Sequence, residues 1–279
     1  MPRLWLRDWE LQVGTVLITP GAGRIPLDIA FEVTKDSTRA PNTAAIQVYN
    51  LSPARRASIT TPVQISLKAG YKDLTSTIFV GRARDIGSNP GIFSQRSDTD
   101  VITTFEAKDG GTGYTNGRIE TSFGAGVPIL TVLKAAVEAL GVGLGNLEST
   151  ALTLTGGADN YPEGTVLSGP ARNEVNRVVS SCGLRWSIQD GNFQLQRGSQ
   201  PVETRAITLS PSTGLIGSPS KGADSKVNAQ AMLIPGLYPS RVVVLESTTH
   251  EGNYQVKSVR YVGDTFGGDW LADLVLEEY

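Results

Sequence analysis

The sequence predicts a mainly β protein with a small α+β module, and three observations lead to this fold class. First, 31 of the 279 residues are glycines without a periodic repeat, which indicates many turns and therefore many short strands. Second, the first and last thirds of the chain contain short apolar runs that alternate with polar residues at a period of two. Third, the apolar spacing changes to three and four residues in the middle third. The sequence thus predicts a helix-containing insertion flanked by, or interleaved with, two β-rich segments.

The first third is predicted to form a series of strands. In its clearest run, Leu27, Ile29, Phe31 and Val33 alternate with polar or small residues, as is typical of a strand with one buried face. Five or six strands at the observed spacing favour a small barrel or a sandwich. The further strands are predicted within 11–18, 45–49, 63–69, 78–83 and 101–107.

A short helical turn is predicted between two of these strands. Ser52 followed by Pro53 is an N-cap with proline at the first helical position. Leu51 and Ile59 flank the turn, and we expect them to plug one end of the barrel. We interpret the turn as a structural element.

The middle third is predicted to form the α+β module. Helices are expected at 128–140 and from 170 to about 182, and each is followed by a glycine in the capping position. The sequence Asp190-Gly191-Asn192, between predicted strands at 184–189 and 193–197, is a strong hairpin signal.

The last third returns to the β pattern. Residues 210–219 are predicted to form an irregular loop in which Leu215 and Ile216 are an exposed-looking apolar pair. His250 falls in a turn and is interpreted as a solvated residue. The predicted strands of this third lie at 206–209, 226–234, 241–247, 252–263 and 271–277.

The residue counts exclude several kinds of active site. A single cysteine, Cys182, forbids an intrachain disulfide, and a single histidine leaves almost nothing for a zinc site or a histidine-based triad. Cys182 lies on the apolar face of the second predicted helix, so we interpret it as a small core residue. Asp264, Asp269 and Asp273 lie in a turn-rich stretch where solvated carboxylates are expected. We predict no enzymatic activity, no metal and no cofactor.

The run from Gly110 to Arg118 is the one glycine-rich stretch that could bind a phosphate group. It lacks the lysine and the following Ser or Thr of a P-loop and does not open directly into a helix. We therefore interpret this run as a loop without a ligand.

Charge and hydropathy restrict the partners. The net charge is -2 and no basic block is present, so specific nucleic-acid binding is not expected, although DNA could pass a neutral or acidic wall. No stretch approaches the roughly 20 apolar residues of a membrane span. The N-terminus lacks the apolar region of a secretory signal, which indicates synthesis in a reducing cytoplasm.

Two groups of short phrases resemble a known family. The opening group is Asp28–Lys35, Pro41–Ala44 and Val48–Ser52. The closing group is Ser210–Pro219, Leu233–Pro235, Gly263–Thr265 and Gly268–Trp270. In order and spacing, over essentially the whole chain, these phrases resemble the baseplate hub proteins of contractile-tailed bacteriophages.

The resemblance implies two tube-like β-barrel domains with a smaller module attached. It assigns residues 1–108 to the first barrel, 109–198 to the α+β module, and 199–279 to a second barrel that can share strands with earlier segments. The chain is compact, so the functions of extra domains in larger hub proteins are not carried over.

The resemblance also implies a structural role in a phage tail. Three copies with two barrels each would present six barrels and so adapt a sixfold tail tube to a threefold central spike while DNA passes. The implied partners are two further copies, a tail tube or tube-initiator protein on one side and the spike on the other. The tape measure and baseplate wedge proteins are further candidates. The protein would be assembled in the host cytoplasm and reside in the virion tail.

Candidate contacts with other subunits or partners are Leu215, Ile216, Asn50, Leu51 and Trp270. For Leu215 and Ile216, a plug between subunits and burial within their own barrel both remain open.

Two other functions also remain open. A receptor- or glycan-binding tail-tip protein would use exposed aromatic clusters, for which the sequence offers Trp5 and Trp9. A tail-associated peptidoglycan hydrolase would need paired carboxylates, whose separation in space is not given by the sequence.

Overall fold

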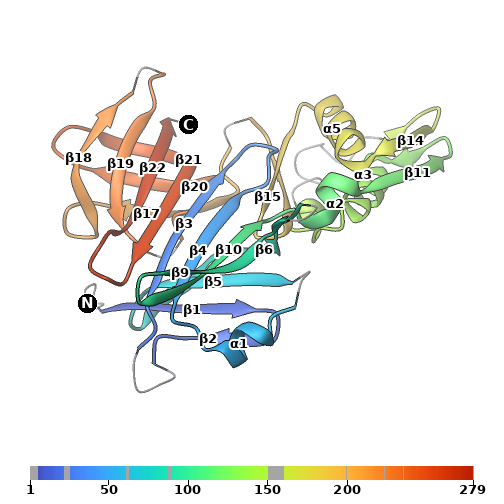
Figure 1. Cartoon of the computed structure of the whole chain (residues 1–279). Helices are drawn as coiled ribbons and strands as arrows, with labels where there is room; N and C mark the ends of the chain where they lie inside the picture. The colour runs from blue at the N-terminus through green and yellow to red at the C-terminus, as the bar shows by residue number, and fades with distance from the viewer. Residues whose placement is uncertain are drawn as a thin grey trace. The chain divides into compact units, whose positions relative to one another are not determined.

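The chain divides into two compact units. Unit 1 combines Met1–Asp36, Asn42–Lys108 and Glu203–Tyr279, and unit 2 combines Ser37–Pro41 with Asp109–Val202. The predicted fold class, mainly β with a helix-containing insertion, is confirmed (Figure 1). The assignment of 1–108 and 199–279 to two separate domains stays a prediction. The computed structural model describes residues 6–21, 26–60, 63–86, 89–149, 160–198, 200–222, 224–234 and 236–278.

Unit 1 is built on one 14-stranded sheet (Figure 1). From the first third it takes β1 (Arg7–Val13), β2 (Val16–Ile18), β3 (Ile29–Asp36), β4 (Thr43–Tyr49), β5 (Gln64–Tyr71), β6 (Leu74–Ala83), β9 (Ile92–Ser97) and β10 (Asp100–Lys108). From the last third it takes β17 (Glu203–Leu209), β18 (Leu215–Lys221), β19 (Val227–Met232), β20 (Arg241–Glu246), β21 (Glu251–Asp264) and β22 (Trp270–Glu278). Two short strands, β7 (Asp85–Ile86) and β8 (Asn89–Pro90), pair separately.

The first and last thirds share this sheet because β21 pairs with β3. Tyr261 lies opposite Val33 in the register, and the strand order is β18-β19-β22-β21-β3-β4-β10-β6-β5-β1-β2. β21 is 14 residues long, so one of its edges can pair with two strands, with β20 near the start of β21 and with β3 near its end. β22 pairs along the opposite edge of β21. Where the structure describes the chain, these pairings do not close the sheet into a barrel. The two tube-like barrels implied by the resemblance correspond to one continuous open sheet.

Alternating residues decide which face of the sheet is buried. In β3, Ile29, Phe31 and Val33 are buried, while Glu32 and Thr34 are exposed. The same alternation in neighbouring strands builds one continuous apolar core. Burial of side chains of this size contributes about 1.5–3 kcal/mol each, so this core face stabilises the whole of unit 1.

The predicted helical turn after β4 is confirmed as α1 (Pro53–Ala57). Ser52 is its N-cap, and the Oγ atom accepts a hydrogen bond from the Arg55 backbone N–H at 3.3 Å. Leu51 is buried and Ile59 packs against the core of unit 1, as expected for a short helix that covers the end of a sheet.

Unit 2 has its own apolar core between α3 (Ile129–Ala139), α5 (Ala171–Ser181) and short β ribbons. Both predicted helices are therefore confirmed. The hairpin is confirmed as well, since Asp190 and Gly191 have φ values of 54° and 78°, as its tight turn requires. The ribbons are β11 (Arg118–Phe123) with β14 (Thr165–Pro170), β12 (Val127–Pro128) with β13 (Asn160–Tyr161), and β15 (Arg185–Gln189) with β16 (Asn192–Gln196).

The predicted loop at 210–219 is wrong in its second half. β18 starts at Leu215 and pairs with β19, with an irregularity between Ile216 and Ser220. Gly217, with a φ of 65°, and Pro219 fall inside this irregularity. Glycine and proline are turn signals in a sequence, so their presence led to the prediction of a loop. An edge strand such as β18 tolerates both residues.

The interpretation of Gly110–Arg118 as a loop is also wrong. Residues Gly111–Asn116 form a short helix, α2. A Cβ atom at Gly113 would lie 1.8 Å from the Leu140 carbonyl oxygen, so this glycine allows α2 to approach the end of α3 closely. The glycines of this run thus serve helix packing.

Among the strands that were not predicted, β9 and β11 have mostly exposed residues and β14 has a single buried one, so the apolar alternation is weak. Among the described residues, no helix is long and apolar enough to cross a membrane.

Candidate interaction surface

The exposed face of the unit 1 sheet carries a continuous row of polar side chains, which we call the polar row. Its members come from β19, β22, β21, β3, β4, β10, β6 and β5, so both β-rich thirds contribute to it. Because side chains alternate between faces along each strand, residues in one register line project from the same face. In order across the sheet, the polar row is Gln230, Asp273, Arg260, Thr34, Thr43, Lys108, Arg82 and Gln64.

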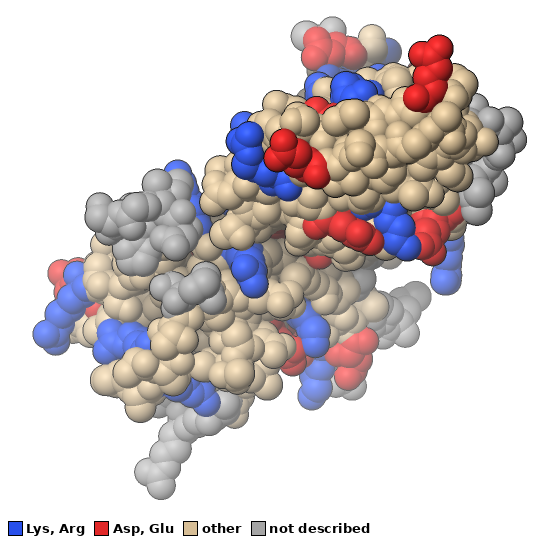
Figure 2. Space-filling model, turned by 90° about the vertical axis from the view of Figure 1, so that its right-hand side faces the viewer, with Lys and Arg blue, Asp and Glu red and all other residues tan. Residues whose placement is uncertain are grey.

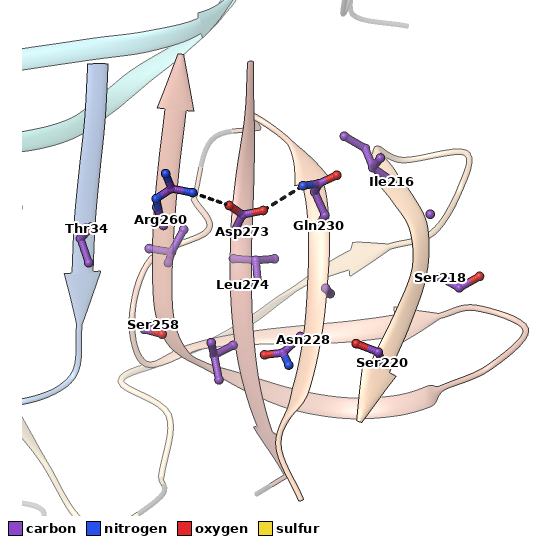
Figure 3. Close-up of a pocket in the computed structure, with 14 residues that line it drawn as sticks. Thr34, Ile216, Ser218, Ser220, Asn228, Gln230, Ser258, Arg260, Asp273 and Leu274 are labelled. Carbon is purple, nitrogen blue, oxygen red and sulfur yellow. Dashed lines mark hydrogen bonds and ion pairs between the residues drawn. The ribbon is translucent and has the colours of Figure 1, made fainter. Parts of the chain in front are cut away.

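Arg260 is the centre of an ion-pair network on this face. Its Nη2 atom donates to Glu32 Oε2 at 2.8 Å, and its Nη1 atom donates to Asp273 Oδ2 at 3.2 Å. Gln230 Nε2 donates to the other oxygen of Asp273 at 2.9 Å. The network therefore ties four adjacent strands, β19, β22, β21 and β3, together through side chains. Figure 3 shows the part that joins Gln230, Asp273 and Arg260.

The network shifts the titration of its members. The hydrogen bond from Arg260 lowers the pKa of Glu32, although partial burial acts in the opposite direction. The two carboxylates raise the pKa of Arg260 in turn, the hydrogen bond to Glu32 first. Both shifts favour the ionised forms of Glu32 and Arg260, so this part of the face presents a paired rather than a free cation.

The sheet face is hollowed over β3, β21, β22, β19 and β18. The cavity has a volume of about 620 Å³ and opens on the network of Arg260, Asp273 and Gln230 (Figure 3). Its described lining contains Ile216 but neither an aromatic residue nor a histidine nor a cysteine. Such a lining offers hydrogen bonds and charge pairing to a polar partner. The remaining polar lining side chains are Thr34, Ser218, Ser220, Asn228 and Ser258.

A second hollow of about 400 Å³ continues on the same face over β3, β4 and β10. Its lining includes Glu32, which belongs to the ion-pair network, and Thr34, which also lines the larger cavity. A further ion pair in this lining joins Arg84 to Glu106 at 3.6 Å. The sheet face therefore mixes both signs of charge. On the side of the molecule that Figure 2 shows, basic and acidic side chains are also interspersed.

The structure distributes the five predicted contact residues between core and surface. Leu51, Leu215 and Trp270 are buried within unit 1. Asn50 is exposed, and its side chain donates to Asp100 Oδ1 at 2.9 Å and accepts from the Val101 N–H at 3.0 Å. Ile216 is 38% exposed and lines the larger cavity. Of the five predicted residues, it is the one that lies beside the polar row, opposite Gln230 in the register. The role of these residues in subunit contacts stays a prediction.

Two of the residues weighed for chemistry, Asp264 and Asp269, lie together across the turn between β21 and β22, where the Asp264 N–H donates to the Asp269 carbonyl oxygen at 2.8 Å. Asp273 belongs to the network, the carboxylate of Asp264 accepts from the Phe266 backbone N–H, and Asp269 is exposed. His250 is half-buried rather than solvated, because its turn is folded back through a hydrogen bond from its N–H to Ser247 Oγ. Within the described ranges, no group of three or more His, Cys, Asp or Glu side chains could hold a metal ion.

Cys182 packs half-buried against the core of unit 2, in agreement with the interpretation as a core residue. Trp5 and Pro235, which entered the sequence-based hypotheses, lie outside the described residues.

The polar row itself was not anticipated. Its signal was present as the polar half of each alternating strand, for example Glu32 and Thr34 in the run around Phe31. A sequence does not give the register between strands, however, so the row could not be assembled from it.

Comparison with known proteins finds solved structures of similar fold but no family model or curated protein of matching sequence. The structure is similar to the 43 kDa tail protein of prophage MuSo2 from Shewanella oneidensis, with a TM-score of 0.65, 9% identity and 98% of each chain covered. It is also similar to a tail protein from Neisseria meningitidis MC58, with a TM-score of 0.62, 8% identity, and 98% of this chain and 97% of that chain covered.

A third similar structure is the Escherichia coli c3393 protein, a component of the type VI secretion system that resembles the T4 tail proteins gp27 and gp5. The TM-score is 0.59 at 12% identity, with 96% of this chain and 76% of that chain covered. At these identities the likeness concerns the fold, and the chain has the fold of phage tail proteins and of a type VI secretion component.

Proposed function

We propose that this chain is a structural protein of a phage tail baseplate and forms a homotrimeric ring at the hub. The observation that carries the proposal is the fold, which is similar to those of two phage tail proteins over 98% of this chain. The phrases in the sequence that resemble hub proteins of contractile tails support the finer assignment to the hub.

The open sheet supports assembly into a ring. Within the described residues, β18 and β2 end the strand order and pair on one side only. Unpaired sheet edges have to be covered, and a neighbouring copy can cover them while continuing the sheet. Three copies would then close a ring by threefold symmetry, and the two β-rich thirds of each copy would supply six similar segments. Such a ring would match a sixfold tail tube on one side and a threefold spike on the other.

The polar row supports a role as channel wall. Arg260 is paired with two carboxylates, Glu32 and Asp273, so a passing DNA duplex would meet no free cation from Arg260 and an excess of one negative charge. Since each phosphate contact adds salt-dependent affinity, a wall of paired charges would let DNA slide. Lys108 and Arg82 lie farther along the row and would supply the cations of this wall.

The proposal is tested by the mass and the location of the protein. Light scattering of the purified chain should give three copies, and imaging of tail particles with a tagged chain should place it on the tail axis between tube and spike. A chain located away from the axis, at a fibre tip for example, would contradict the proposal. A monomer in isolation that becomes axial in assembled tails would agree with it.

The glycan-binding and hydrolase alternatives lack an observation of their own. The larger cavity has no aromatic side chain on which a sugar ring could stack, and the three weighed aspartates do not form a facing pair in it.

A further inference from the structure

One end of unit 1 displays an aromatic side chain that is exposed and yet held in place. Phe266, in the turn between β21 and β22, is 59% exposed. Its ring meets the ring of Tyr49 edge to face, with centroids 4.7 Å apart. Aromatic side chains, phenylalanine among them, are enriched in protein interfaces relative to the rest of the surface.

The turn that carries Phe266 is fixed to the start of β3. The Phe266 N–H donates to Asp264 Oδ1 at 2.7 Å. Thr265 Oγ1 donates to Asp28 Oδ1 at 2.9 Å and accepts from the Ile29 N–H at 2.8 Å. These hydrogen bonds already order the turn. Binding of a partner to Phe266 would therefore cost little conformational entropy in this chain.

Three carboxylates lie beside the two rings. Asp264 Oδ1 accepts from the Phe266 N–H, Asp28 Oδ1 accepts from Thr265 Oγ1, and Asp100 Oδ1 accepts from the side chain of Asn50, the chain neighbour of Tyr49. In agreement with this geometry, burial and then the charges of Asp264, Asp100 and Asp28 raise the pKa of Tyr49. Asp269 is exposed in the same turn as Phe266.

A cation is also close to this end. The Arg7 guanidinium donates to the Asp264 carbonyl oxygen and lies 5.7 Å from the centroid of the Trp270 ring. Arg7 thus shows, within the chain, a guanidinium group that combines an aromatic face with a hydrogen bond to an oxygen acceptor at this end.

We propose that Phe266, Tyr49, Asp28, Asp100, Asp264 and Asp269, together the Phe266 surface, dock an arginine-bearing segment of a protein partner. An arginine side chain can stack its planar guanidinium on the Phe266 ring and form two parallel hydrogen bonds with a carboxylate. The carboxylates repel phosphate-bearing partners such as nucleic acids and anionic lipids. The inference does not depend on the proposed function, since the surface belongs to the isolated chain.

A labelled octa-arginine peptide tests the proposal, with octa-lysine as a probe of equal charge. Anisotropy titrations of the full-length chain at low salt should show tighter binding of octa-arginine than of octa-lysine. Phe266→Ala should weaken octa-arginine binding by about two- to fivefold, the size of an exposed cation–π contact. Asp269→Asn should weaken it by about twofold, as for an exposed ion pair.

Matched variants separate the Phe266 surface from general attraction to an acidic protein. Phe93→Ala removes another exposed phenylalanine, on β9, and Glu246→Gln removes one negative charge on β20; both should leave binding unchanged. Phe266→Leu keeps an apolar side chain and should abolish the preference for octa-arginine over octa-lysine. Equal binding of the two peptides, or equal losses in the control variants, would overturn the proposal.

Discussion

The rings of Phe31 and Trp270 meet edge to face, with their centroids 5.3 Å apart and their planes at 73°. Gly263 lies between them in the sheet, because it pairs with Phe31 on one side and with Trp270 on the other. Trp270 Nε1 also donates to the Gly70 carbonyl oxygen on β5 at 2.9 Å. This contact joins β3 of the first third to β22 of the last third, and so the two β-rich parts fold as one unit.

Gly263→Ala should destabilise unit 1. A Cβ atom at this position would lie 2.2 Å from Cζ of Phe31, so the ring would have to leave its place against Trp270. We expect the free energy of unfolding to fall by about 1–3 kcal/mol, as for overpacking elsewhere in protein cores. Urea unfolding followed by tryptophan fluorescence measures this difference. Gly21→Ala, at a position with no heavy atom within 4 Å, is the control, and an equal loss there would refute the explanation.

Trp270→Phe should lower stability without changing self-association. The substitution keeps a ring beside Phe31 but leaves the Gly70 carbonyl oxygen without its buried donor. The expected loss is about 1–3 kcal/mol, the cost of an unsatisfied buried polar group. Chemical unfolding at two protein concentrations separates the effects. If the variant instead unfolds like the wild-type protein but no longer associates, Trp270 acts between subunits.

Much of unit 1 follows from the sequence because its strands bury one face. The run around Phe31 predicted β3, and the same alternation located β4, β5, β10 and most strands of the last third. β9 was missed because it is exposed on both faces and β18 because Gly217 and Pro219 interrupt it. The apolar period reports burial, so strands at an edge leave little trace in it.

The candidate surface could be predicted less well than the fold. Arg260 and Glu32 are 228 residues apart in the chain, and only the pairing of β21 with β3 brings them together. Of the predicted contact residues, Leu51 and Trp270 were chosen for their apolar character and are buried for the same reason. A sequence shows which residues avoid water but not whether their own chain or a neighbour covers them.

Ile216→Ser should affect assembly and leave the fold intact. Ile216 is 38% exposed on the edge strand β18, whereas its neighbour Leu215 is buried. If β18 lies at a subunit contact, the substitution should shift the trimer midpoint to about tenfold higher protein concentration, as expected for the loss of one buried aliphatic side chain. Sedimentation at graded concentrations measures the shift. Leu215→Ser should instead lower the unfolding midpoint, and an unchanged trimer in Ile216→Ser would exclude this contact.

The Arg260–Glu32 pair should contribute to stability at neutral but not at acidic pH. Arg260 holds the pKa of Glu32 below its usual 4.5, so this contribution is present above that value and is lost as the pH falls through the folded-state pKa. Both side chains are about half exposed, so Arg260→Gln should cost about 1 kcal/mol or less near pH 7. The difference should shrink as the pH falls through the folded-state pKa of Glu32. Unfolding of Arg260→Gln, Glu32→Gln and the double variant at pH 7 and in a series of acidic buffers isolates the pair, and a difference independent of pH would contradict the assignment.

Neutralising the carboxylates of the network should turn the polar row into a DNA-retaining wall. In the double variant Glu32→Gln/Asp273→Asn, Arg260 keeps its charge but loses both carboxylate partners. Each phosphate that it contacts should steepen the dependence of log affinity on log salt by about 0.9. Anisotropy of a labelled duplex at graded salt should therefore show tighter and more salt-dependent binding by the variant than by the wild-type chain, and phage carrying the variant should eject DNA more slowly. Glu246→Gln/Glu251→Gln removes the same charge from the β20–β21 turn and should do neither. Equal DNA binding by both double variants would mean that net charge alone is responsible and that the polar row is no channel wall.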